Sequence, residues 1–281
     1  MRDAVLTELR PVEEVAAVRA SLEPEPERDS ESSSDPSAPR VLILGRPHVF
    51  GHVGGVGTKR ERRLTEIVAF LALHPGASAE AIDEILGRGQ RVTANTRNAY
   101  VSRARAWLGR APDGTPYLPI LTAHDDYRLH PAVRTDWDDF GDLLREGVQA
   151  GLDGASALRE AIELVRGRPF ADAAVGTYDW AEPLVHQMID QIVDAAHLYA
   201  VLAAADDYRS VREVLAIALT VDPCNELLHR DAIAAAHRAG DAAEVDRLVA
   251  VLQHRILEID PDDGVEEETA DLLDRVRPRR R

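Results

Sequence analysis

The order of the elements that this sequence predicts constrains its fold more than any single motif. Residues 40–131 contain two short apolar runs, then three amphipathic segments, then two extended runs joined by a polar turn. Residues 136–276 show helical periodicity alone, with glycine and proline between the segments. The 281-residue chain is therefore expected to be mainly α with a small α+β domain, and its length allows two domains.

Two strands and two helices are predicted at the start of the α+β part. VLILG at 41–45 is typical of a strand, and HVFGHVGGVG at 48–57 predicts a second strand with a glycine-rich turn. No Gly-Lys-Ser/Thr follows these glycines, so a phosphate loop is not expected. Residues 58–73 predict an amphipathic helix, and a second helix is expected after Ser78, whose hydroxyl can cap it.

The third helix, predicted over residues 92–108, is the most informative segment for function. Thr93 or Asn95 can cap its start, and Gly109 can end it. Its outer side combines small residues with arginines, a combination that suits a helix entering the DNA major groove. An ordinary surface helix with solvated arginines would show the same pattern. The side expected to face a core carries Tyr100, Val101, Ala104, Trp107 and Leu108.

Residues 111–130 predict a β-hairpin after this helix. The sequence 112–114 (Pro-Asp-Gly) signals a turn, and YLPIL and DYRLH are extended runs separated by residues 122–125. Three helices followed by a hairpin, with the third helix basic, describe a winged helix-turn-helix.

The C-terminal part predicts helices only. Asp207 and Asp241 open comparable helices 34 residues apart, which is the period of tetratricopeptide-like stacking. The sequence shows no nucleophile–base pair and no metal-ligand spacing, so neither an enzyme nor a metal or other cofactor is expected. The predicted helices cover residues 136–150, 155–166, 180–205, 208–220, 225–238, 242–257 and 265–276.

Residues 1–39 are expected to hold a loosely attached helix within 1–22 and a disordered linker rich in Glu, Pro and Ser at 23–39. RPRRR at 277–281 forms a basic tail. The expected domains are therefore 1–39, the winged helix at 40–131, the helical array at 132–276, and the tail.

Charge is distributed unevenly along the chain. The net charge is −16, yet residues 40–110 hold 12 Lys and Arg against 5 acids (+7), and residues 136–276 hold 11 Arg against 31 acids (−20). Physiological salt screens charges that lie more than about 8 Å apart. A partner that approaches residues 40–110 therefore experiences mainly their positive charge and not the net charge of the chain. The single cysteine, Cys224, excludes an internal disulfide, and no apolar run approaches the length of a membrane span. A cytoplasmic protein is expected.

Several of these stretches resemble a known family. LALHPGASAEAIDEIL, TRNAYVSRARAWLG and YRL resemble the winged-helix domain of SARP-type bacterial regulators. TDWDDFGDLLREG, LREAIELVRGRPFAD and WAEPLVHQMIDQIVDAAHLYA resemble the bacterial transcriptional activator domain (BTAD), a tetratricopeptide-like module. The most specific pieces are HPG (74–76), VSRAR (101–105), RGRPFAD (166–172) and WAEP (180–183), and the resemblance covers about residues 40–276.

The resemblance implies a transcription regulator that binds double-stranded DNA through the third helix and the wing. It also implies that the helical domain contacts protein partners such as RNA polymerase or another regulator. Arg128 matches the wing's final strand, where it would reach a phosphate or the minor groove. The recognition-helix positions are occupied by Thr96, Arg97, Ser102, Arg103 and Arg105.

We expect base readout from Arg103 with Thr96, Ala99 and Ser102. Phosphate contacts are expected from Lys59, Arg60, Arg62, Arg91, Arg97 and Arg110. The alternative is an interaction scaffold without DNA binding, in which the acidic array receives a protein partner. Similar modules also form cytoplasmic tails of membrane-anchored, envelope-associated proteins, so a tail module is open as well. The sequence leaves a homodimer open.

Overall fold

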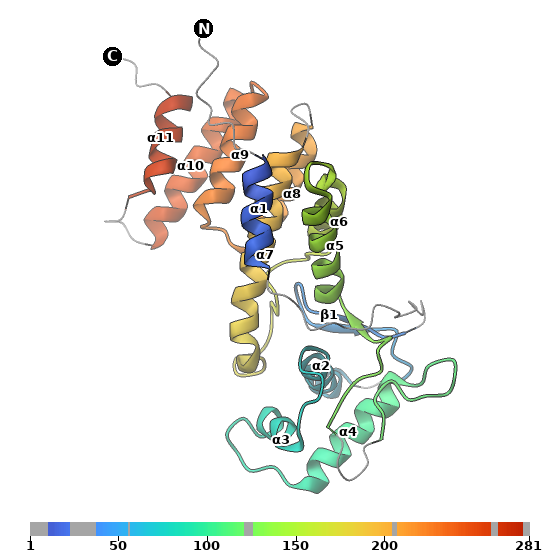
Figure 1. The fold of residues 1–281 in the computed structure, drawn as a ribbon. Coiled ribbons are helices and arrows are strands. Elements are labelled where there is room, and N and C mark those ends of the chain that lie inside the picture. The colour runs from blue at the N-terminus through green and yellow to red at the C-terminus, as the bar shows by residue number, and fades with distance from the viewer. Residues whose placement is uncertain are drawn as a thin grey trace. The chain divides into compact units, whose positions relative to one another are not determined.

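The computed structural model describes residues 11–22, 38–55, 57–120, 126–203, 207–259 and 264–277 (Figure 1). These form two compact units. Unit 1 takes its described residues from Met1–Pro24, Phe140–Arg168 and Gln187–Arg281, and unit 2 from Glu25–Asp139 and Pro169–His186. The fold class expected from the sequence is confirmed: a small α+β part is followed by a helical array. Among the described residues, no helix combines the length and apolar character that crossing a membrane requires.

Unit 2 contains a three-stranded sheet in the order β2-β1-β3. β1 (Arg40–Leu42) runs antiparallel to β2 (His48–Phe50), with Val41 opposite Val49, and parallel to β3 (Arg134–Thr135). Val41 and Val49 are fully buried because alternate strand positions face the core. The pairing of β1 with β3 joins the two ends of the α+β segment.

Three helices complete the α+β segment: α2 (Thr58–Leu73), α3 (Ala79–Gly87) and α4 (Ala94–Leu108). The hydroxyl of Ser78 accepts a hydrogen bond from the Ala81 N–H at 3.3 Å, and that of Thr93 accepts one from the Thr96 N–H at 3.3 Å. The predicted Ser78 cap is therefore confirmed, and of the two caps predicted for the third helix the structure has Thr93, with Asn95 inside α4. Fully buried side chains from all three helices form their core: Leu64, Ile67, Leu71, Ile82 and Leu108.

The segment after α4 forms isolated bridges in its described part, where a regular hairpin was predicted. Tyr127 exchanges two backbone hydrogen bonds with Ala77, and the His130 N–H donates to the Tyr117 carbonyl at 2.8 Å. Arg110 bridges Pro116. Prolines at 112, 116 and 119 cannot donate ladder hydrogen bonds, which limits regular pairing. Residues 121–125, which include the whole turn predicted at 122–125, lie outside the described residues.

Residues 169–186 belong to unit 2 although they come from the middle of the helical sequence. The Phe170 N–H donates to the Ile43 carbonyl at 3.0 Å, just after β1. The Trp180 ring meets the Phe70 ring of α2 edge-on, with centroids 5.0 Å apart. The sequence predicted a winged-helix domain that ends at residue 131. In the structure, residues 169–186 pack on the same unit, although they come later in the chain.

Unit 1 is an array of helices in which α9 packs against α8, α10 and α11. The helices are α5 (Asp136–Ala150), η1 (Gly151–Asp153), α6 (Ala155–Glu163), α7 (Glu182–Leu202), α8 (Tyr208–Val221), α9 (Glu226–Arg238), α10 (Ala242–Ile259) and α11 (Glu267–Val276). The first residues of α5 and α7 belong to unit 2, and the short helix η2 (Asp179–Ala181) precedes α7. These bounds lie within a few residues of those predicted, because amphipathic periodicity and caps are local signals.

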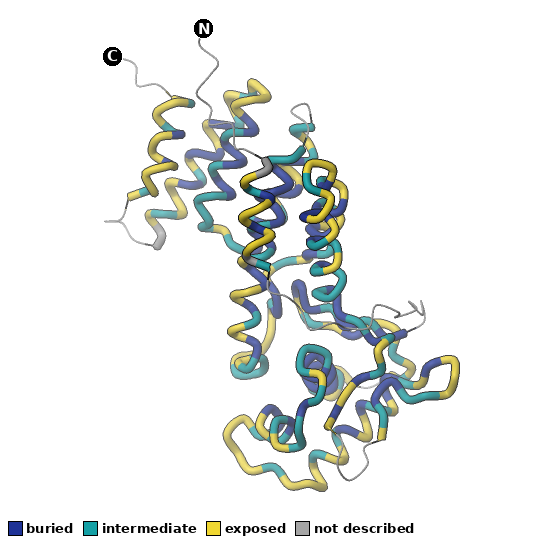
Figure 2. Tube along the Cα trace, viewed as in Figure 1, coloured by how far each residue is buried: buried dark blue, intermediate teal, exposed yellow. Residues whose placement is uncertain are grey.

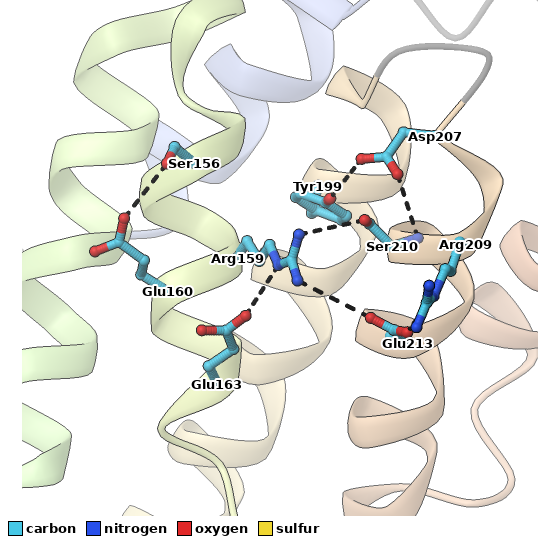
Figure 3. A network of polar contacts seen from close by, with 9 residues as sticks. All are labelled: Ser156, Arg159, Glu160, Glu163, Tyr199, Asp207, Arg209, Ser210 and Glu213. Carbon is cyan, nitrogen blue, oxygen red and sulfur yellow. Dashed lines mark hydrogen bonds and ion pairs between the residues drawn. The ribbon is translucent and has the colours of Figure 1, made fainter.

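The 34-residue spacing seen in the sequence corresponds to equivalent helix starts. The Asp207 carboxylate accepts a hydrogen bond from the Ser210 N–H at 3.4 Å, and the Asp241 carboxylate accepts one from the Glu244 N–H at 3.0 Å. Figure 3 shows Asp207 in a polar network in which Arg159 of α6 donates to the Ser210 hydroxyl of α8 at 3.2 Å. This hydrogen bond links α8, the helix that Asp207 caps, to α6.

The N-terminal helix α1 (Pro11–Ser21) packs on unit 1, which corrects the expectation of a loosely attached helix. Val15 and Val18 are each only 6% exposed, and the Arg19 guanidinium donates to the Val148 carbonyl of α5 at 2.8 Å. Ala16, between the two buried valines, is exposed. The sequence pattern of this helix did not predict that its valines would be buried against unit 1. The expected linker at 23–39 falls almost wholly outside the described residues.

Candidate nucleic-acid interface

The helix α4 has one buried side and one exposed side (Figure 2). Val101, Ala104 and Trp107 anchor it in the core of unit 2. The helix contains no acidic residue. Its exposed positions are small, polar or basic: Ala94, Asn95, Thr96, Asn98, Ala99, Ser102, Arg103 and Ala106. The uncompensated positive end of the helix dipole and this small-residue face both favour an anionic surface that approaches closely.

Arg103 is exposed and lies over an aromatic ring of its own helix. Its guanidinium carbon is 5.7 Å from the centroid of the Tyr100 ring. The guanidinium carbon of Arg63 on α2 is 6.0 Å from the same centroid. Tyr100 therefore brings a cation of α2 next to one of α4, and a guanidinium over an aromatic face loses little of its capacity to donate hydrogen bonds outward.

The first two turns of α2 present further cations. Lys59, Arg60 and Arg62 are exposed, and none has an ion-pair partner among the described residues. Gly57 at the N-cap provides no side-chain cap. Several cations at a helix N-terminus oppose the dipole, and an anionic partner would offset that cost.

Arg91, Arg110 and Arg128 are exposed and frame α4 in the sequence. Arg91 precedes the helix and Arg110 follows it, so an ideal helix of this length separates them by roughly 25 Å. Arg110 donates to the Gly114 carbonyl at 2.8 Å. The Arg128 guanidinium lies against Gly76, where an added Cβ would come within 3.3 Å of its Nη2 atom. Arg91 and Arg110 can therefore contact different phosphates and cannot share one.

Arg97 and Arg105, which were expected to contact DNA, are half-buried and engaged by the protein itself. Arg97 forms an ion pair with Asp83 of α3. Arg105 donates to the carbonyls of Leu118 and Pro119, at 2.8 Å and 3.0 Å. Their spacing along the helix does not distinguish them from Arg103, because only the tertiary fold supplies their partners.

A buried ionic cluster behind α4 was not predicted. Glu66 of α2 is 1% exposed and pairs with Arg63 and Arg88. Burial raises the pKa of Glu66, and the two guanidinium groups oppose that increase. Arg63 also donates to the Leu86 carbonyl near the end of α3, and Arg88 donates to the Thr177 hydroxyl at 3.2 Å. The only sequence signal was an acid inside the apolar run of α2.

The cluster also controls the turn between α3 and α4. Arg88 has a φ angle of 47°, in the left-handed region that non-glycine residues rarely adopt. Burial raises the pKa of Tyr178, and the nearby Glu66 carboxylate adds to the increase. The turn that follows α3 is thus held by the contacts of Arg88 with Glu66 of α2 and with Thr177.

The exposed side chains of this region are suited to binding an anionic surface. Within the described residues, no group of three His, Cys, Asp or Glu is placed to hold a metal ion. The exposed side chains of α4 and of the start of α2 carry hydrogen-bond donors and positive charge, which match phosphates and guanine edges.

Comparison with protein-family models and with curated proteins gives no match. Among solved structures, one similar chain is described as Mycobacterium tuberculosis EmbR in complex with low affinity phosphopeptide. The two are 19% identical with a TM-score of 0.59, over 85% of this chain and 64% of that chain. The present chain therefore matches less than two thirds of its neighbour's length, and the likeness concerns the fold.

Proposed function

We propose that the chain is a transcription regulator in which α4 enters the major groove of double-stranded DNA. The observation that supports this most directly is the face of α4, which is exposed, free of acids, rich in small residues, and backed by a buried side. A recognition helix needs close approach to base edges and a rigid anchorage. The sequence resemblance to SARP-type regulators supports the same role.

In this proposal Arg103, with Thr96 and Ser102, contacts base edges, and the cations around them contact phosphates. The phosphate set comprises Lys59, Arg60, Arg62, Arg91, Arg110 and Arg128, all exposed. Arg97 and Arg105 hold α4 in place from the protein side. About six phosphate contacts would give a slope near −5 for log affinity against log salt concentration.

The helical array of unit 1 would contact protein partners, such as RNA polymerase or another regulator. Its sequence is strongly acidic, which disfavours DNA on this part of the molecule. A homodimer would double the short site that a single α4 can read.

Fluorescence anisotropy on selected DNA fragments tests the proposal. Arg103→Ala should reduce affinity by about 1–3 kcal/mol and relax sequence preference at the contacted base pair. Arg209→Ala is the matched control, since Arg209 is a highly exposed arginine of α8 whose side chain is 90% accessible. Equal affinities of the Arg103 and Arg209 variants for the selected fragment would contradict the assignment.

The second candidate function is an interaction scaffold that does not bind DNA, either free or as a tail of an envelope-associated protein. Two features favour this candidate: the net charge of −20 over residues 136–276, and the exposed acid Asp126 in the segment where a wing is predicted. Retention of genomic fragments at two salt concentrations separates the candidates. Weak retention that disappears equally for all fragments as salt rises would favour the scaffold.

A further inference from the structure

Tyr100 lies on α4 one turn before Arg103, and two guanidinium groups lie over its ring. The Arg103 guanidinium carbon is 5.7 Å from the ring centroid, and that of Arg63 on α2 is 6.0 Å from it. Tyr100 is half-buried, whereas Arg103 is exposed. The sequence pattern placed Tyr100 among the core-facing residues of this helix, so its contact with an exposed arginine was not predicted.

The two arginines differ in how they are held. The Arg63 guanidinium forms an ion pair with Glu66, which is 1% exposed, and donates to the Leu86 carbonyl near the end of α3. The Arg103 guanidinium forms no hydrogen bond or ion pair with the residues that the structure describes. Tyr100 therefore lies between a guanidinium that the protein fixes and one whose donors are available to a partner.

The contact with Tyr100 prepares Arg103 for binding. A guanidinium that stacks on an aromatic ring keeps its N–H donors at the edge of its plane, where they point away from the ring. An arginine side chain loses rotamer freedom when it binds, and stacking removes part of that freedom beforehand. Two N–H donors in one plane match the O6 and N7 acceptors that guanine presents in the major groove.

We infer that Tyr100 is a positioning residue that holds Arg103 for one guanine, and that it thereby sets the preference of α4 for a G·C pair at that position. The inference rests on the DNA-binding function proposed above. It adds to that function the base that Arg103 reads and the side chain on which this selectivity depends.

Selection of bound fragments from a random double-stranded DNA library by the full-length protein tests this inference. Wild type should enrich guanine at the position that Arg103 contacts. Tyr100→Leu should lower the preference for guanine over adenine there by about two- to fivefold, because the guanidinium loses its ring, and should leave the other positions unchanged. Tyr100→Phe keeps the ring and should retain the wild-type preference. Tyr208→Leu, at a half-buried tyrosine that begins α8 in unit 1, is the matched control and should change no preference.

Substitution of Arg103 shows whether Tyr100 acts through it. Arg103→Lys keeps the charge but lacks the planar fork, so it should lose the guanine preference and keep most of the salt dependence. In the Arg103→Lys background, Tyr100→Leu should change the preference no further. The inference would be overturned by a Tyr100→Leu effect that is equal at every position or persists undiminished in that background, and equally by a Tyr100→Phe variant that behaves like Tyr100→Leu.

A measurement without DNA separates this inference from the proposed function. The ring current of Tyr100 should shift the side-chain proton resonances of Arg103 upfield in the NMR spectrum of the wild-type protein, and Tyr100→Leu should abolish that shift. The Arg103 signals are assigned by their absence from the spectrum of Arg103→Lys. Unshifted signals in wild type would overturn the positioning of Arg103 by Tyr100, whatever the selection yields. Shifted signals together with no enriched fragment would instead overturn the DNA-binding function, and the guanine assignment with it.

Discussion

At the scale of single residues, buried carboxylates hold together parts of unit 2 that are distant in sequence. Asp136 is 3% exposed and accepts from the backbone N–H groups of Ile43 at 2.8 Å and of Leu44 at 3.1 Å. The chain passes Ile43 just after β1, at a point where the sheet offers these groups no partner strand. A buried N–H without an acceptor is costly, so one carboxylate ties the start of α5 to the end of β1.

Asp136→Ala should therefore lower the free energy of unfolding by about 2–4 kcal/mol, since two buried donors lose their acceptor. Asp136→Asn keeps one acceptor oxygen and should cost less. Asp142→Ala on the same helix is the control, because Asp142 is exposed and forms an ion pair with Arg145 on the helix surface. Urea unfolding measures the three variants, and a similar cost for Asp136→Ala and Asp142→Ala would refute the role of Asp136.

At the scale of the element, α4 is a helix whose arginines divide into two roles. Arg97 reaches back to Asp83 of α3, and Arg105 reaches the backbone of residues 118–119. Arg103 contacts neither Asp83 nor residues 118–119, and its guanidinium lies over the Tyr100 ring. The first two orient the helix between its neighbours, and the third is available to a partner.

The two roles predict different responses to substitution. Arg97→Ala leaves the half-buried Asp83 without its cation and should lower the stability of unit 2 by about 1–3 kcal/mol. Arg103→Ala should leave stability within about 0.5 kcal/mol of wild type, as expected for an exposed position, and act on DNA affinity. Urea unfolding and anisotropy on the same samples compare the variants. A loss of stability for Arg103→Ala equal to that for Arg97→Ala would contradict this division.

At the scale of the whole molecule, the proton on His197 links α1, α7 and α9. Burial by itself lowers the pKa of His197, but the hydrogen bond to Asp231 and the charges of Asp231 and Glu14 together outweigh burial, so the pKa of His197 is raised. Burial raises the pKa of Asp231, while His197, Arg230 and Arg238 oppose that increase. A histidine whose pKa is higher in the folded state stabilises that state fully below its unfolded pKa of about 6.5. This stabilisation is lost as the pH rises through the folded pKa.

The free energy of unfolding of unit 1 should therefore fall as the pH is raised from 6 to 9. His197→Gln removes the titrating group and should flatten that part of the profile, while His186→Gln, an exposed site on the same helix, should not. Urea unfolding of the three proteins across this pH range provides the measurement. Parallel profiles for wild type and His197→Gln would show that another group carries the dependence.

Much of the local structure could be predicted from the sequence, because its causes lie within a few residues of each other. The starts of α3 and α4 follow from Ser78 and Thr93, and the 34-residue spacing follows from Asp207 and Asp241. The small, basic face of α4 follows from its periodicity in the same way. Whether that face and its cations bind DNA stays a prediction.

The sequence by itself determined where helices begin and end, which faces are apolar and where positive charge gathers, since these are properties of neighbouring residues. The tertiary structure alone decided which charged groups have partners. Arg97, Arg105 and Glu66 resemble exposed residues in a linear pattern, yet each is engaged by atoms 13 to 22 residues away. The seating of α1 and the return of residues 169–186 to the sheet were also decided there. Contacts between distant segments depend on the packing of the whole core, and no local pattern encodes which segments that packing brings together.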